Sequence, residues 1–410
     1  MEIGDTWDES ETHRDSLTGR KVRRLTSAGR INQTPTYHTN SGFTADGRYL
    51  VFASVRGHET WIIAAEVATG TLKLLWRAPG VGDRSYIHRC MSLDFDDVDG
   101  RGICGNRVCV APGSGRAVFS VEESLIAVDI ETCEAWVLIE SCGDEWIFGA
   151  PAVSPDERWV ANTLSSSHPE MRGGAWTFTP EKHYADYLHR MRVVRVPLDG
   201  KGEMETIYEL AEPAQSAHCA FCPSDPRLLY FDLDRPPRYW RGGDGTTPRL
   251  WILDVDTGAV KPLKSSYPGD FQTHAAWLWD GSGMCYHGPA RDGGEYFGIV
   301  RRDGATAWEH VFPDVTLYGH CTPDAGRKAM IIDGTFSRDS LQWLHWDAPA
   351  CAQPKLEPIC RHRTEWGSLP GQYSHPHPLT SRCARWISFT AAREGRSDVF
   401  VVDVNTWMER

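Results

Sequence analysis

Short apolar runs alternate with polar turns along this chain. A recurring unit begins with a turn that contains Pro, Asp or Gly and continues into a short apolar strand. After a second turn, an alternating strand closes on Asp and a Thr-Gly-like turn. Residues 43–52 with 60–70, and residues 153–161 with 192–200, are two copies. Because alternation with a period of two marks a half-buried strand, the pattern predicts β-structure.

Seven such units follow one another along the sequence. Their spacing of roughly 40 to 70 residues is typical of four-stranded propeller blades with loop insertions. The second halves at 125–132, 250–258 and 399–404 are near copies of one strand and its turn. We therefore predict an all-β fold, a seven-bladed β-propeller in which residues 1–410 form a single domain. The units begin near Phe43, Ala111, Val153, Cys222, Trp279, Thr322 and Leu379.

The start of the chain supplies a strand that has no blade of its own. Residues 21–26 (Lys-Val-Arg-Arg-Leu-Thr) resemble the outer strand of a blade. We expect this N-terminal strand to pair with the last blade, closing the ring and removing two exposed sheet edges. Residues 180–188 are the one expected helical insert, within the third blade.

The composition agrees with this fold and limits the classes of binding partner. The chain has 17 Trp, 13 Tyr, 14 Phe, 38 Gly and 25 Pro, a mixture that favours strands and tight turns. Its 43 Lys and Arg against 55 Asp and Glu give a formal charge of -12. This charge opposes docking on nucleic acid or on an anionic membrane, so neither is an expected partner. An anionic substrate would have to be attracted by a local cluster of Arg, His or metal.

The cysteines and the N-terminus indicate an intracellular protein. No stretch approaches the ~20 apolar residues that span a bilayer, and the first residues carry no apolar signal core. We expect a cytoplasmic protein whose 12 cysteines are reduced. Cys219 and Cys222 form a C-x-x-C, but on a strand their side chains would point to opposite faces, which argues against a zinc or redox pair.

Histidines mark the candidate chemistry. Four of the seven units carry a histidine just before the turn: His218, His274, His320 and His375. The first strand of each blade lines the central channel of a propeller, so equivalent positions on adjacent blades form a ring. One such histidine would more often hydrogen-bond between blades, whereas four in register indicate a site.

The last of these histidines belongs to a candidate metal site. His375 and His377 are two residues apart on an extended segment, so both rings leave the same face and can hold one ion. The Gln372 side-chain oxygen would add a hard ligand, and His320 from the neighbouring blade would complete the set. Without a thiolate, such a set suits manganese or a similar first-row divalent ion better than a Cys-rich zinc site.

These motifs together resemble the oligogalacturonate lyases, seven-bladed propeller enzymes of pectin breakdown. The resemblance rests on Gln372-x-x-His375-x-His377, on His320 before a turn, on Thr273-His274 ahead of Asp280-Gly281, and on Arg249 through Asp254, and it runs nearly end to end. It implies β-elimination of short oligogalacturonates, including digalacturonate and its unsaturated form. It further implies manganese on Gln372, His320, His375 and His377, His274 as the Brønsted base, and Arg249 on the substrate carboxylate.

A basic, aromatic loop at 234–247 would either make further substrate contacts or be an ordinary solvated loop. Ala275 and Ala276 stand where the family has Glu and an aromatic residue, and this loop is longer than expected. A lyase of the same mechanism acting on another uronate-bearing oligosaccharide, such as a glucuronate-linked one, therefore remains an alternative, as does a non-catalytic interaction scaffold. Tyr373, Arg238 or water would protonate the leaving oxygen. The expected substrate-binding residues are His218, Arg238, Tyr239, Arg241 and Tyr373.

Overall fold

The structure is a computed structural model of the 410-residue chain. It describes residues 1–33, 37–57, 59–79, 108–121, 124–140, 145–147, 149–166, 190–212, 214, 216, 218–233, 248–264, 272–347, 353–369 and 371–405. At positions 79, 146, 147, 371 and 372 the description covers the backbone alone. The expected helical insert at 180–188 lies outside these residues. No helix among the described residues is long and apolar enough to cross a membrane.

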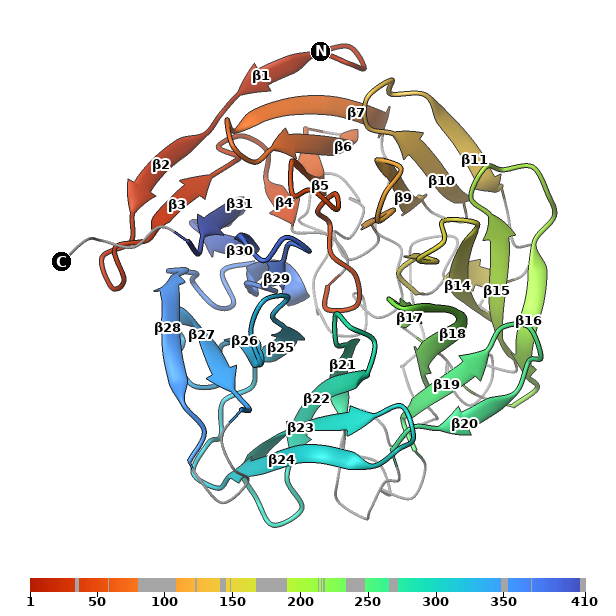
Figure 1. Ribbon diagram of the computed structural model, residues 1–410. Coiled ribbons are helices and arrows are strands. Elements are labelled where there is room, and N and C mark those ends of the chain that lie inside the picture. The colour runs from red at the N-terminus through yellow and green to blue at the C-terminus, as the bar shows by residue number, and fades with distance from the viewer. Residues whose placement is uncertain are drawn as a thin grey trace, which may run out of the picture.

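Across the described residues, the strands form seven antiparallel sheets arranged as blades in a ring (Figure 1). This confirms the predicted seven-bladed β-propeller. Blade 1 contains β4 (Ile31–Gln33), β5 (Tyr49–Arg56), β6 (Glu59–Glu66) and β7 (Thr71–Pro79), and blade 2 contains β8 (Val108–Val110), β9 (Arg116–Val121), β10 (Ser124–Asp129) and β11 (Ala135–Ile139). Blade 3 contains β12 (Glu145–Ile147), β13 (Ala152–Val153), β14 (Trp159–Ser166), β15 (Met191–Pro197) and β16 (Glu205–Leu210).

The second half of the chain builds the four blades that carry the predicted site. Blade 4 contains β17 (Cys219–Cys222), β18 (Asp225–Asp232), β19 (Leu250–Asp254) and β20 (Val260–Pro262), and blade 5 contains β21 (Thr273–Trp277), β22 (Gly283–Pro289), β23 (Glu295–Arg301) and β24 (Thr306–Phe312). Blade 6 contains β25 (His320–Pro323), β26 (Ala329–Asp333), β27 (Ser340–His345) and β28 (Leu356–Arg361). The short 3-10 helix η3 (Gly371–Ser374) precedes blade 7, which contains β29 (Leu379–Thr380), β30 (Trp386–Arg393) and β31 (Arg396–Asp403).

The N-terminal segment closes the ring, as predicted. Strand β3 (Lys21–Arg24) pairs with β31, with Val22 opposite Val402. The structure adds two strands: β2 (Glu11–Arg14) extends blade 7 beyond β3, and β1 (Thr6–Asp8) covers the outer edge of β7 in blade 1. The segment therefore joins both blades at the closure and covers backbone groups that would otherwise be open to pairing.

The hydrophobic core is divided into layers between neighbouring blades. Alternate residues of a strand enter different layers: Cys219 and Phe221 pack with blade 3, whereas Ala220 and Cys222 pack with blade 5. The predicted opposite orientation of the two cysteines is confirmed. The described cysteines have free thiols. Because each layer requires two blades, the inner strands are fixed relative to one another, and side chains at their starts are held around a common centre.

Candidate metal centre and catalytic site

Blades 4, 5 and 6 each present a histidine to the channel with the same arrangement of hydrogen bonds. Each histidine stands at or next to the start of the innermost strand, and its Nδ1 is hydrogen-bonded to the side chain near the end of the next strand. Where that partner is a carboxylate, Nδ1 holds the proton and Nε2 keeps its lone pair. The pairs are His218–Asp232 at 2.8 Å, His274–His287 at 2.6 Å and His320–Asp333 at 3.0 Å.

Blade 5 departs from its neighbours by a bulge at the histidine. Thr273 pairs with His287 and Ala276 with Cys285, so two residues of β21 oppose one residue of β22. His274 lies within this bulge with a φ of 47°, in the left-handed region that non-glycine residues seldom adopt. Such backbone strain clusters at functional sites. The bulge places the His274 ring beside the His320 ring, with centroids 4.4 Å apart.

The predicted metal histidines lie together at the hub. One ring nitrogen each of His320, His375 and His377 lie within 4.8 Å of one another, close enough to bind one ion. His375 and His377 come from the segment between η3 and β29. The Nδ1 of His375 is buried and has no hydrogen-bond partner among the described residues. A buried polar atom without a partner is uncommon, and a bound cation would satisfy a ring nitrogen of this histidine. The donor set fits a divalent ion.

Asp333 links two of the predicted metal-binding histidines, His320 and His377, across two blades. Its carboxylate accepts hydrogen bonds from the His320 backbone N–H at 2.7 Å and from the His377 backbone N–H at 2.9 Å, in addition to the His320 ring. The residue is fully buried. Partners of this kind orient a metal-binding histidine and fix its tautomer.

We expect Asp333→Asn to weaken divalent metal binding by about 10- to 100-fold, because the carboxylate that orients His320 and His377 is lost. Titration of the metal-depleted protein with Mn²⁺ measures the affinity. Asp324→Asn is the matched control, since Asp324 is a buried carboxylate of blade 6 that accepts from the Trp343 indole at 2.8 Å instead. Equal metal affinity in the two variants would contradict the role of Asp333.

Several predicted contacts lie outside the described residues, and one predicted side chain lies in the core. The Gln372 side chain and residues Arg238, Tyr239 and Arg241 lie outside what the structure describes, so their roles stay predictions. The substrate-binding role of Tyr373 is not supported. Its side chain is 1% exposed and packs in a cluster with Ile31, Val55, Leu369 and Ala392. The 3-10 turn directs the ring into the protein, although Tyr373 lies only two residues before His375, a predicted metal ligand.

A segment that no sequence pattern indicated lies at the centre of the ring. The described part of the chain between β4 and β5, which begins at Tyr37, reaches into the middle of the propeller (Figure 1). There the Tyr37 hydroxyl lies 2.8 Å from Nε2 of His274 and 3.2 Å from Nε2 of His320, joining the predicted base to a predicted ligand. The Tyr318 hydroxyl lies 2.9 Å from the same His274 nitrogen. Tyr37 is buried, whereas Tyr318 is 43% exposed, so Tyr318 is the more accessible of the two residues.

His274 has the electrostatic character of a neutral base. Burial lowers its pKa well below the ordinary value, and the neighbouring His320, His287, His38 and His218 add to the effect. The ring is therefore unprotonated at neutral pH and can accept a proton.

Arg249 and His218 are brought together through one carboxylate. Asp232 accepts from the Arg249 guanidinium at 2.9 Å and from the His218 ring at 2.8 Å. Burial alone would raise the pKa of Asp232, but His218 and Arg249 outweigh it and hold the pKa below its usual value. Arg249 also donates to the Gln272 carbonyl oxygen at 3.2 Å. Its guanidinium carries a positive charge to the hub, partly balanced by Asp232.

Buried neutral histidines make stability depend on pH. Burial lowers the pKa of His362 to about 4, and burial together with His218 holds the pKa of His38 well below its usual value. For a depressed pKa, the stabilisation is complete above the unfolded-state value near 6.5 and is lost as pH falls toward the folded-state value.

We expect the free energy of unfolding of the metal-depleted protein to fall as pH decreases from about 6.5 to about 4. Each such histidine contributes a slope of up to about 1.4 kcal/mol per pH unit, because the unfolded chain binds the proton that the folded chain excludes. Urea unfolding at several pH values gives the slope. The variant His362→Gln should reduce it, and a slope unchanged by this substitution would be evidence against the assignment.

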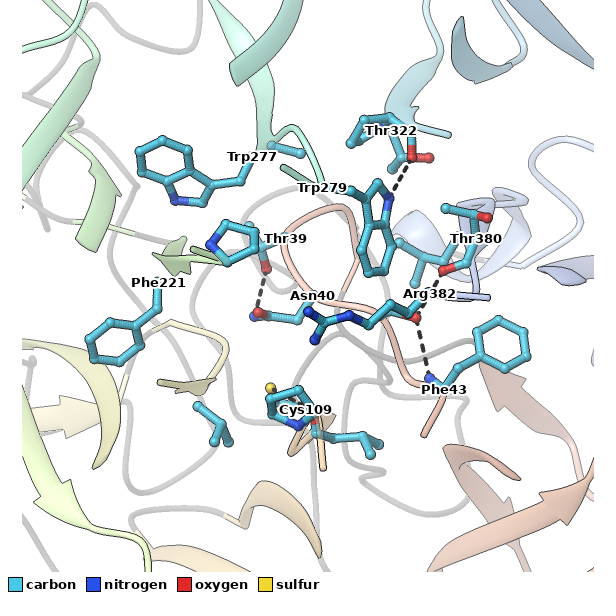
Figure 2. Close-up of a pocket in the computed structure, with 18 of the residues that line it drawn as sticks. Thr39, Asn40, Phe43, Cys109, Phe221, Trp277, Trp279, Thr322, Thr380 and Arg382 are labelled. Atoms are coloured by element: carbon cyan, nitrogen blue, oxygen red, sulfur yellow. Dashed lines mark hydrogen bonds between the residues drawn. The ribbon is translucent and has the colours of Figure 1, made fainter. Parts of the chain in front are cut away.

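A separate cavity lies at the opposite end of the inner strands. It has a volume of about 140 Å³ and is lined mainly by apolar groups, with Arg382 reaching across it in Figure 2. His274 is near the start of β21, whereas Trp277 ends that strand and lines this cavity. His38 borders it and contacts the His274 ring, at a centroid distance of 5.1 Å, so the segment in the hub separates the cavity from the histidine cluster.

Fold and site together define a seven-bladed β-propeller with a cluster of histidines at its hub whose ring nitrogens are close enough to hold a metal ion. Two curated proteins are similar to this chain. The oligogalacturonate lyase of Dickeya dadantii (strain 3937) is 23% identical over 413 residues, covering 96% of this chain and 95% of that protein. The oligogalacturonide lyase of Pectobacterium atrosepticum is 24% identical over 310 residues, covering 68% and 72%. No family model matches the chain.

Two solved structures have the same fold. The crystal structure of an oligogalacturonate lyase from Vibrio parahaemolyticus superposes with a TM-score of 0.75 at 20% identity and covers 98% of both chains. An oligogalacturonate lyase in complex with manganese superposes with a TM-score of 0.73 at 18% identity, again over 98% of both chains. The resemblance found in the sequence is confirmed by relatives of that name over nearly the whole chain.

Proposed function

We propose that this protein is a metal-assisted lyase that cleaves short oligogalacturonates by β-elimination. The observation that carries the proposal is the cluster of His320, His375 and His377 beside the buried, neutral His274. A propeller that only binds a protein partner has no need of converging ring nitrogens. The similarity to named oligogalacturonate lyases over 96% of the chain supports the same substrate class.

The reaction requires removal of a weakly acidic proton. The C5 proton of a 4-linked uronate lies next to a carboxylate, whose charge must be neutralised before the proton can leave. A divalent ion on His320, His375 and His377 would supply positive charge for this purpose, and manganese is the ion we propose. Arg249 is the guanidinium placed nearby, and Arg suits a carboxylate because its charge is permanent and its geometry bidentate.

His274 performs the proton abstraction in this mechanism. Its Nε2 takes the C5 proton, the electrons of the broken C5–H bond form a double bond between C4 and C5, and the C4–O bond breaks. The electron pair of that bond leaves with the glycosidic oxygen, which then takes up a proton. Because Tyr37 and Tyr318 both lie at hydrogen-bond distance from Nε2, the substrate reaches the nitrogen by displacing the more exposed Tyr318.

A direct assay tests the proposal. The purified protein, its metal content measured, is incubated with digalacturonate, and the absorbance of unsaturated uronate is followed. We expect absorbance to rise in the presence of Mn²⁺ and to stop on chelation. Parallel assays with glucuronate-linked disaccharides test the alternative substrate. Bound metal without a rise on any uronoside would overturn the lyase assignment and favour an interaction scaffold.

A further inference from the structure

We propose that His287 and Glu295 are positioning residues that fix the tautomer of His274, so that Nε2 is the nitrogen offered to the substrate. The identity of His274 as the base rests on the proposed function, but the control of its tautomer does not. Neither residue was singled out in the sequence.

The inference starts from an uninterrupted chain of hydrogen bonds within blade 5. Glu295 Oε1 lies 2.5 Å from Nδ1 of His287, and Nε2 of His287 lies 2.6 Å from Nδ1 of His274. All three side chains are buried: the residues are 8%, 0% and 2% exposed. Water therefore does not compete for these bonds, and each nitrogen must find its partner inside the protein.

The direction of the chain is set at its acidic end. An ionised carboxylate only accepts, so Nδ1 of His287 must donate to Glu295. A neutral His287 then has a lone pair on Nε2, which accepts from Nδ1–H of His274. This leaves the lone pair of His274 on Nε2, the nitrogen that faces the hydroxyls of Tyr37 and Tyr318. The opposite tautomer would place two lone pairs against each other between the rings.

Comparison with the flanking blades shows what the extra imidazole achieves. In blades 4 and 6, Asp232 and Asp333 contact the channel histidine directly. A carboxylate at that distance increases the basicity of the imidazole, which suits a metal ligand such as His320. In blade 5, His287 stands near the end of the second strand and moves the negative charge one ring away. His274 thus receives the same tautomer through His287, without a carboxylate in direct contact with its ring.

Glu295→Gln is the variant that tests the inference. It keeps the shape of the side chain but removes the obligatory acceptor, so either tautomer of His287 can bond to it. We expect the His274 tautomers to mix and kcat on digalacturonate to fall by about 10²- to 10⁴-fold, the contribution of a positioned base, with KM and metal content nearly unchanged. The readout of tautomer is the ¹⁵N chemical shift pattern of the histidine rings in Zn²⁺-loaded protein, which is diamagnetic.

A matched control lies on the next strand. Glu309 is a glutamate of β24 that accepts from the Tyr286 hydroxyl at 2.6 Å and does not contact the histidines named above, so Glu309→Gln should leave both readouts unchanged. In case Glu295→Gln fails to fold, His287→Gln breaks the same chain one step later and should give the same two changes.

Each outcome decides a separate question. An unchanged ¹⁵N pattern in folded Glu295→Gln protein would overturn control of the tautomer. A changed pattern with full turnover would overturn its role in the reaction. If the unsubstituted protein turns over no uronoside but its ¹⁵N pattern shifts in Glu295→Gln, the proposed function fails while control of the tautomer stands.

Discussion

Replacement of His274 by alanine is expected to lower kcat on digalacturonate by about 10²- to 10⁴-fold while the protein keeps its metal. The lost group is the nitrogen that takes the C5 proton, and general-base catalysis contributes in this range. Metal content should persist because the nitrogens of His320, His375 and His377 converge without His274. Turnover at saturating substrate and elemental analysis of the same samples measure the two quantities.

The control for this substitution is a histidine away from the hub. His345 lies on β27 and bonds to Glu357 at 3.2 Å, so His345→Gln should leave both turnover and metal content unchanged. His274→Gln, which fills more of the space, separates loss of the base from collapse of the bulge. If His274→Ala loses its metal, His274 is a ligand rather than the base, and the roles assigned within the hub are wrong.

Replacement of His375 by alanine is expected to weaken metal binding by more than about 100-fold and to abolish turnover at low metal concentration. A direct ligand should cost more than the 10- to 100-fold that the loss of an orienting partner costs. His375 is the ligand best suited to the experiment. It is less deeply buried than His320 and His377, and its Nδ1 has no partner within the described chain, so its removal breaks the fewest structural contacts.

The measurement for His375→Ala is turnover as a function of added Mn²⁺, together with the bound metal after dialysis. Partial recovery of turnover at high Mn²⁺ would show that the remaining nitrogens still direct the ion to the site. His377→Ala is a less clean test, because the backbone N–H of His377 bonds to Asp333 and its φ of 45° already strains this turn. Stoichiometric metal in dialysed His375→Ala protein would rule out the proposed centre.

The fold was predictable because each blade repeats one pattern. Turn residues and strand alternation are local properties, and seven copies at similar spacing leave few other architectures. The same repetition located His218, His274 and His320, since they occupy nearly one phase of the unit. It could also have located Asp232, His287 and Asp333, which occupy one phase of the following strand.

Other parts of the site could not be found in this way. Tyr37 belongs to a segment without an equivalent among the described residues of the other blades, and no period of the sequence indicates that it lies in the hub. The bulge at His274 depends on how β21 packs against its neighbours, which residue types alone do not determine. The burial of Tyr373 could not be predicted from the sequence either, because the turn that directs its ring into the protein depends on packing with distant residues.

Because β3 pairs with β31, the sheet of blade 7 contains strands from both ends of the chain. Val22 can pair with Val402 only after every intervening blade has been synthesised. The ring of a nascent chain therefore stays open until its last strands emerge. The entropic cost of closing so large a loop grows only logarithmically with its length. The pairing within a single sheet can therefore offset the cost of closing the whole ring. The same join fixes blade 7 beside blade 1, and with it the ring that surrounds the hub.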